Sequence, residues 1–102
     1  MITLDEIHQR LADGTFEFSR HAFKRAVERN ISERDVREAG RRASIIEDYP
    51  DDKYAPSCLL FGFTDAGRPL HIQVSYVESA MLKIITIYQP DPEEWYDYAR
   101  RR

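Results

Sequence analysis

The pattern of apolar residues changes once along this chain, close to residue 44. Before that point, apolar residues recur every three or four positions, and Ser or Thr precedes each helical run. After it, segments rich in β-branched and aromatic residues are separated by short turns. Helices followed by hairpin-linked strands are typical of the α+β class. We therefore predict N-terminal helices packed on a three- to four-stranded antiparallel meander, with a short C-terminal helix.

Caps, periodicity and turn residues place the individual elements. Thr3, Ser19 and Ser32 are predicted helix N-caps, and Gly14 ends the first helix. Helices are predicted over residues 4–13, 19–30, 33–42 and 92–100. Strands are predicted over residues 15–18, 44–49, 57–64, 68–77 and 81–89. On this assignment, the last helix docks Trp95 and Tyr98 on the sheet.

Length and composition predict one domain, residues 1–102, in the cytoplasm. The chain contains no run of about eighteen apolar residues that could span a membrane. Acidic residues stand where a secretory signal would be basic. Cys58 is the only cysteine, which excludes an internal disulfide, and its apolar neighbours indicate a buried thiol. We expect no membrane association, and the oligomeric state leaves no signal in the sequence.

Charge is segregated along the chain although the net charge is only −3. Residues 19–42 hold eight Arg and Lys against four Asp and Glu, and form a single basic block. These side chains have two interpretations: a solvated helix surface, or a patch that binds anions.

A row of bases runs along the predicted second helix. Ala22, Phe23, Ala26 and Val27 form its expected buried stripe. His21, Arg25 and Arg29 follow one another at four-residue spacing beside that stripe. Arginine and histidine in such a row can hold a phosphate, whereas Glu28 offers local ion pairing instead.

A second polar group lies on the predicted sheet. His71 and Gln73 share one face of their strand. A hairpin with a two- or four-residue turn places them opposite Tyr88 and Thr86, whereas a three-residue loop would undo this pairing. Four polar side chains among Ile, Val and Leu are more than core packing requires. They form a site for chemistry, or they have an ordinary explanation: His71 and Tyr88 hydrogen-bond to each other, or this face of the sheet is exposed to solvent.

Motifs for metal and nucleotide chemistry are absent. The chain has no CxxC pair, no HExxH, no glycine-rich phosphate loop and no GxSxG elbow. We predict no metal site and no cofactor.

Four phrases together carry a resemblance: FSRHAFKRAVERNIS at 18–32, IEDYP at 46–50, GRPLH at 67–71 and IITIYQP at 84–90. Over about residues 15–95, the chain resembles the bacterial family catalogued as domain of unknown function 4258. The resemblance implies a RelE/barnase-like toxin fold similar to that of RelE-like and motility quorum-sensing regulator-like ribonucleases. It also implies an RNA substrate and a small zinc-finger or helix-turn-helix antitoxin as partner.

If activity follows the resemblance, the reaction is metal-independent RNA cleavage. His71 is then the expected base, and His21 or Tyr88 is the acid. Arg25 would hold the phosphate oxygens, with Thr86 beside them. The remaining predicted RNA or phosphate contacts are Arg29, Lys24 and Gln73.

Two other interpretations remain open. The domain is a non-catalytic binding module if the basic helix 19–30 only docks a partner protein or an RNA. It is a degenerate toxin fold if His71 and Tyr88 merely tether elements of the structure. The acidic net charge weighs against a free ribonuclease, because such proteins usually have a basic surface.

Overall fold

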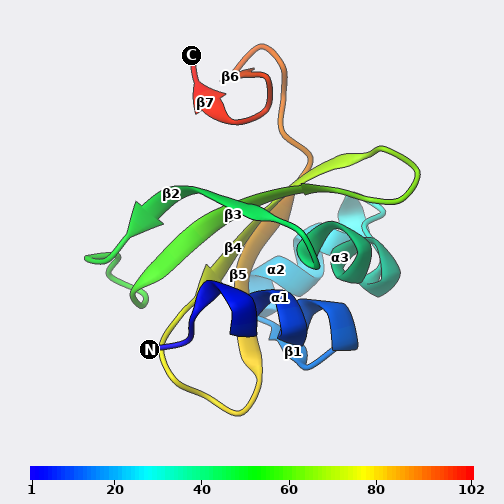
Figure 1. Cartoon of the computed structure of the whole chain (residues 1–102). Coiled ribbons are helices and arrows are strands. Elements are labelled where there is room, and N and C mark those ends of the chain that lie inside the picture. The colour runs from blue at the N-terminus through cyan, green and yellow to red at the C-terminus, as the bar shows by residue number, and fades with distance from the viewer.

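A computed structural model describes residues 1–102 and contains three helices and two sheets (Figure 1). The helices are α1 (Leu4–Asp13), α2 (Arg20–Glu28) and α3 (Glu33–Gly40). The strands are β1 (Phe16–Phe18), β2 (Ser44–Tyr49), β3 (Ser57–Phe63), β4 (Pro69–Ser75), β5 (Leu82–Tyr88), β6 (Trp95–Tyr96) and β7 (Arg100–Arg101). The predicted mixed α+β class is confirmed. None of the helices has the length and apolar character needed to cross a membrane.

The predicted caps begin all three helices. Thr3 and Ser19 accept hydrogen bonds from the backbone N–H three residues ahead, at 3.2 and 3.0 Å. Ser32 and Asp35 form a reciprocal capping box with both bonds at 3.0 Å. Gly14 ends α1 with a φ of 81°, which glycine adopts without steric cost. Local sequence signals therefore set these boundaries.

The main sheet has five strands in the order β1-β5-β4-β3-β2. Strands β2 to β5 are antiparallel neighbours, as the meander predicts. β1 pairs parallel with β5, so the prediction of a purely antiparallel sheet is wrong. Parallel pairing needs a long crossover, and the chain between β1 and β5 supplies it. The predicted register is confirmed, since His71 lies opposite Tyr88 and Gln73 opposite Thr86.

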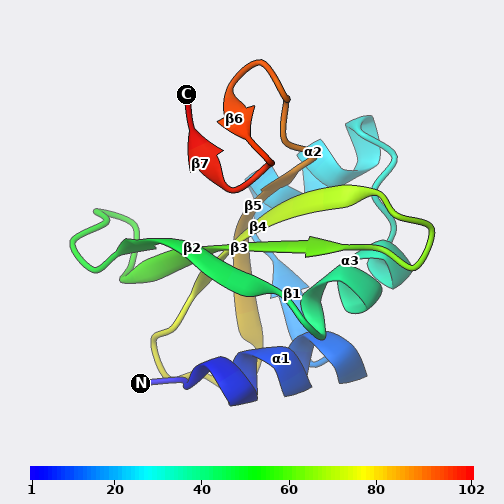
Figure 2. The ribbon, with the colours of Figure 1, turned by 45° about the horizontal axis from the view of Figure 1, so that its top comes forward.

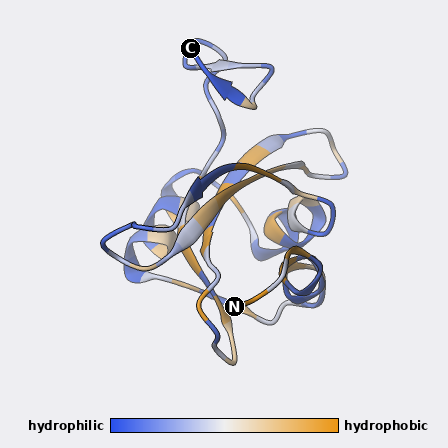
Figure 3. Cartoon of the chain, turned by 60° about the vertical axis from the view of Figure 1, so that its left-hand side comes forward, coloured by the Kyte–Doolittle hydropathy of each residue, from blue (hydrophilic) through white to orange (hydrophobic).

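The hydrophobic core lies between the sheet and the helices. Helices α1 and α3 pack under one face, and α2 lies at the edge beside β5 and β1 (Figures 1 and 2). Val36 of α3 and Ile72 of β4 are fully buried in this layer. Gly62 allows the close approach of β3 to α3, because an added Cβ would lie 2.1 Å from the carbonyl oxygen of Ala39. Hydrophobic positions gather on the strands, whereas β7 is hydrophilic (Figure 3).

The predicted buried stripe of α2 is only half right. Ala22 and Ala26 are buried, but the side chains of Phe23 and Val27 are 59% and 65% exposed. The helix rests on a sheet edge that is too narrow to cover a wide apolar stripe. Phe23 touches the ring of Phe18 in β1 edge-on, but most of its surface remains open to solvent.

The predicted C-terminal helix over residues 92–100 is wrong. Asp91 starts a single turn, and Asp97 and Tyr98 then adopt positive φ values of 50° and 61°. This left-handed pair reverses the chain and joins β6 to β7 as a small hairpin. The hairpin lies over the sheet face that α1 and α3 leave uncovered (Figures 1 and 2). Trp95 docks on the sheet as expected, with 2% of its surface exposed.

Candidate functional site

A histidine and a tyrosine meet on the sheet face away from α1 and α3. His71 of β4 and Tyr88 of β5 are directly opposite each other. The Tyr88 hydroxyl lies 3.1 Å from His71 Nδ1, and the two rings are in edge contact. This pair is the centre of the polar group that the sequence predicts.

The second nitrogen of His71 determines the direction of both hydrogen bonds. His71 Nε2 lies 2.5 Å from the carbonyl oxygen of Tyr98. A carbonyl only accepts, so Nε2 carries the hydrogen. Nδ1 is then unprotonated and accepts from the Tyr88 hydroxyl. The imidazole is a neutral Nε2–H tautomer with both nitrogens in use.

Burial controls the ionisation of this pair. The ring of His71 has no exposed surface, and Trp95 packs edge-on against it at 4.5 Å between centroids. Burial lowers the pKa of His71 below its usual 6.5 and outweighs the Tyr98 carbonyl, which raises it. Burial also raises the pKa of Tyr88. At neutral pH, the pair therefore consists of an uncharged imidazole and an intact phenol.

An ion pair beside His71 was not anticipated from the sequence. Arg101 donates two hydrogen bonds to Glu47, at 2.9 and 3.1 Å, and its guanidinium lies over the ring of Trp95 at 4.6 Å. The Tyr49 hydroxyl also donates to Glu47. Although burial raises the pKa of Glu47, Arg101 and Tyr49 together hold it below its usual value. The IEDYP phrase at residues 46–50 contains Glu47 and Tyr49, so the sequence carried a signal for these two members of the site. No local pattern pointed to Arg101.

The other two predicted residues of the sheet cluster, Gln73 and Thr86, lie two residues away from His71 and Tyr88 along β4 and β5. Gln73 and Thr86 face each other across β4 and β5, and both are half-buried. The Gln73 side-chain amide donates to Ser57 Oγ at 3.0 Å. They extend the polar face away from the hairpin.

Tyr88 also lines an open groove of about 570 Å³ at the edge of the sheet. The lining residues are Arg29, Arg68, Tyr88, Gln89, Asp91 and Glu94. Arg29 donates one hydrogen bond, to the Ile87 carbonyl at 2.8 Å, and guanidinium donors remain for a ligand. Arg68 instead uses all three of its nitrogens in bonds to the protein. Arg29, the C-cap of α2, is therefore the base of this segment that the structure brings to the Tyr88 side of the sheet.

The other bases of α2 lie elsewhere. His21 is exposed and lines a separate hollow with Tyr54 and Ile85. Arg25 pairs with Glu28 at 3.0 Å, which is the local pairing that the sequence allowed. Lys24 is exposed. The structure does not bring His21 and Arg25 together with His71, because α2 turns these side chains away from the groove that Arg29 enters.

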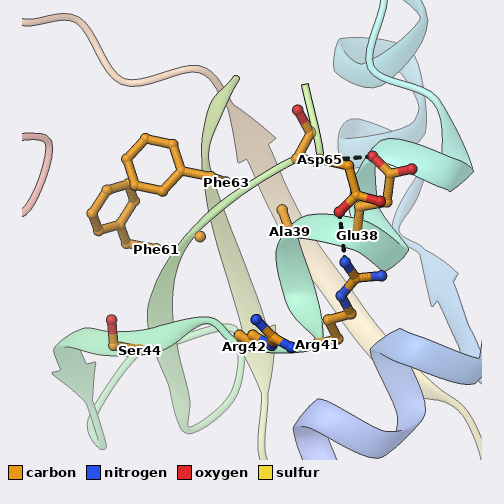
Figure 4. A pocket seen from close by; sticks show the side chains of 10 residues that line it. Glu38, Ala39, Arg41, Arg42, Ser44, Phe61, Phe63 and Asp65 are labelled. Atoms are coloured by element: carbon orange, nitrogen blue, oxygen red, sulfur yellow. Dashed lines mark hydrogen bonds and ion pairs between the residues drawn. The ribbon is translucent and has the colours of Figure 1, made fainter. Parts of the chain in front are cut away.

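A further hollow lies between α3 and the end of β3 (Figure 4). Phe61 and Phe63 lie on one side of it, and Arg41 and Arg42 on the other (Figure 4). Arg41 is bound to Asp65 at 2.6 Å. Phe61 packs edge-on against His71, so this hollow adjoins the histidine from the β3 side.

Fold and site together define a mixed α+β domain with a buried histidine–tyrosine pair beside an arginine-lined groove. Residues 18–89 match the family model described as Domain of unknown function (DUF4258), and the chain belongs to this family. The match includes His71 and Tyr88 and ends before the C-terminal hairpin. No curated protein and no solved structure matches the chain.

Proposed function

We propose that this protein is a metal-independent endoribonuclease of the toxin type, with the arginine-lined groove as its active site. One observation carries the proposal: Tyr88, whose hydroxyl is hydrogen-bonded to a buried, neutral imidazole, lines an open groove that Arg29 also lines. A neutral imidazole whose unprotonated Nδ1 accepts a hydrogen bond from Tyr88 can take up the proton of that hydroxyl at physiological pH. The groove gives a phosphate access to that relay.

The proposed reaction uses the tyrosine as a proton relay. The Tyr88 oxygen accepts the proton of a ribose 2′-hydroxyl while its own proton passes to His71 Nδ1. The 2′-oxygen forms a bond to the adjacent phosphorus, the bond to the 5′-oxygen breaks, and water in the open groove protonates the leaving oxygen. The products are a 2′,3′-cyclic phosphate and a 5′-hydroxyl. The Tyr98 carbonyl and Glu47 stabilise the imidazolium formed on His71.

Arg29 is the proposed phosphate ligand. Its guanidinium is held by the Ile87 carbonyl and stands where charge would develop on the non-bridging oxygens. Asp91 and Glu94 bring two carboxylates to the same groove. We therefore expect the groove to bind one phosphate near Arg29 rather than a long nucleic-acid track, and binding to depend only weakly on salt.

Cleavage of a single-stranded RNA by the purified chain tests this proposal. Tyr88→Phe and His71→Asn should each lower the rate by about 10²- to 10⁴-fold, the usual contribution of a general base. A substrate with a 2′-deoxy sugar at the cleaved position should remain intact. Arg34→Ala is the matched control, since Arg34 is a highly exposed arginine on α3. Full activity of folded Tyr88→Phe would refute the relay, and an inert wild-type chain would refute the function.

If the protein is a toxin, its expression should also affect the growth and the RNA of a bacterial cell. Induced expression of the wild-type chain in a bacterial host should arrest growth and degrade RNA, and Tyr88→Phe should do neither. Co-expression of a small antitoxin protein, the proposed partner, should restore growth. His21→Ala and Arg25→Ala in the same assay show whether the α2 bases contribute.

A non-catalytic binding module is a second candidate that the surface of α2 supports. Phe23 and Val27 are well exposed one helical turn apart, and Arg20 and Lys24 lie on the same helix. Apolar side chains among cations suit a partner with acidic and apolar groups. If this function is correct, Phe23→Ser should abolish capture of a partner protein from the native host, and Tyr88→Phe should have no effect in any assay.

A further inference from the structure

The C-terminal segment, residues 90–102, lies outside the family match but covers His71 on the open face of the sheet. It contributes the Tyr98 carbonyl at Nε2, the Trp95 ring against the imidazole, and Arg101 on Glu47. The two partners of this segment on the sheet, His71 and Glu47, lie inside the match. The segment therefore covers a site whose other members belong to the family domain.

No backbone-to-backbone hydrogen bond joins residues 91–102 to the five-stranded sheet. β6 pairs only with β7, in a sheet of their own. The remaining backbone hydrogen bonds of residues 91–102 also stay within the segment. Its polar links to the five-stranded sheet are the bond from His71 to the Tyr98 carbonyl and the ion pair of Arg101 with Glu47. Loss of the ion pair would thus loosen the cover of His71 without breaking the sheet.

The cover determines which nitrogen of His71 holds the hydrogen. An imidazole exposed to water interconverts between two tautomers and titrates near pH 6.5. The Tyr98 carbonyl selects the Nε2–H form and leaves Nδ1 as the acceptor for Tyr88. No buried side-chain nitrogen or oxygen lacks a partner, so the arrangement is complete as it stands.

We propose that Arg101 and the main-chain carbonyl of Tyr98 are positioning groups, which hold His71 as the Nε2–H tautomer with Nδ1 directed at the Tyr88 hydroxyl. The proposal rests on the proposed function for its role in catalysis, although the tautomer itself is measurable without any substrate. Arg101 acts through Glu47 and Trp95, and it does not touch the reacting groups.

Loss of Arg101 should change the titration of His71 in one direction. The charged and titratable groups near His71 are Glu47 of β2, Tyr88 of β5 and Arg101 of β7. Removing Arg101 takes away a nearby positive charge, leaves Glu47 uncompensated and admits water to the ring. All three changes favour the imidazolium, so the pKa of His71 should rise toward 6.5.

The test is nitrogen-15 NMR of His71 in the full-length chain, as a function of pH. The wild-type chain should show a protonated Nε2, an unprotonated Nδ1 and no titration near pH 6.5. Arg101→Ala should show exchange between tautomers and an upward shift of the titration, and Arg101→Lys should restore part of the wild-type behaviour. Arg100→Ala is the matched control, because Arg100 lies in the same strand over Tyr96 and does not contact Glu47.

An unchanged tautomer and titration in folded Arg101→Ala would overturn the proposal. If that variant does not fold, Arg101→Gln, which keeps a hydrogen-bond donor, decides by the same criteria. In the cleavage assay, Arg101→Ala should lose roughly tenfold or more in rate, with the acid limb of its pH profile moved to higher pH. If Arg101→Ala changes the His71 signals as expected but the wild-type chain cleaves no RNA, the proposed function is refuted and the positioning role remains intact.

Discussion

The guanidinium of Arg68 donates a hydrogen bond to the backbone carbonyl of Asn30, at 2.8 Å and across 38 residues of sequence. It donates a second to the carbonyl of Arg29 at 2.9 Å and a third to the Gln89 side chain at 2.8 Å. Arg68 thereby ties the end of α2 to the strands β4 and β5. This tie holds Arg29 at the edge of the groove.

Arg68→Ala should therefore destabilise the fold by about 1–2 kcal/mol, because two backbone carbonyls at the end of α2 lose their donors. The side chain is partly exposed, so water replaces some of the loss. Urea unfolding measures the change. Arg34→Ala removes one ion pair in which the arginine is 85% exposed, and it should cost less than about 0.5 kcal/mol. Equal costs for the two variants would contradict the assigned role of Arg68.

Gly62→Ala should destabilise the protein by about 2–4 kcal/mol, because the new methyl group meets the rigid backbone of α3. An added Cβ would lie 2.1 Å from the Ala39 carbonyl oxygen. Gly67→Ala is the control, since its φ of +88° brings strain but no atom lies within 4 Å of the added group. Strain alone should cost about 1 kcal/mol. Thermal unfolding of both variants measures the difference, and a Gly62→Ala chain as stable as Gly67→Ala would show that α3 can move away.

The buried histidine predicts a loss of stability in mild acid. The pKa of His71 is lower in the folded chain than its usual 6.5, so the unfolded chain binds more protons below that pH. The free energy of unfolding should thus fall as the pH drops from about 6.5 toward the folded pKa. Urea midpoints of the wild type and His71→Asn at pH 7.5 and 5.5 measure this slope. Equal slopes in the two chains would show that His71 does not contribute to it.

Cys58 should react slowly with alkylating reagents in the native state. Only 1% of its surface is exposed, and burial raises the pKa of its thiol to about 11. At pH 8, this pKa alone lowers the thiolate fraction by about 100-fold relative to a free thiol. Mass spectrometry after iodoacetamide treatment should show protection in buffer and full modification in urea. Rapid labelling of the native chain would indicate local opening between β3 and β2.

Much of the fold follows from local sequence signals. Ser19 and Ser32 cap their helices through backbone groups three residues away, so neighbouring residues are sufficient to predict them. The facing of His71 and Tyr88 matched the prediction for an even-length turn, but turn length alone does not produce it. Val74 pairs with Ile84 next to the turn, and a register shift between Gln73 and Val74 then brings His71 opposite Tyr88. The burial of Cys58 followed from its apolar neighbours.

The α2 surface shows where sequence patterns were insufficient. Phe23 and Val27 have the spacing of a buried stripe, yet they face solvent because α2 lies at the sheet edge. Likewise, the spacing of His21, Arg25 and Arg29 is regular, but only Arg29 reaches the groove. Periodicity identifies one side of a helix, and it does not tell how much of that side the neighbouring elements cover.

The sequence by itself determined the α+β class, the helix starts and the pairing of β4 with β5, since these depend on contacts between near neighbours or across one hairpin. The facing of His71 and Tyr88 also needed the register shift between Gln73 and Val74. Tertiary structure alone decided the parallel β1–β5 pair and the C-terminal hairpin. Residues 92–100 are too few for a helix that is stable by propensity, so distant contacts determined their fold. Trp95 on His71 and Arg101 on Glu47 are such contacts, and they convert an ordinary sheet histidine into a buried one.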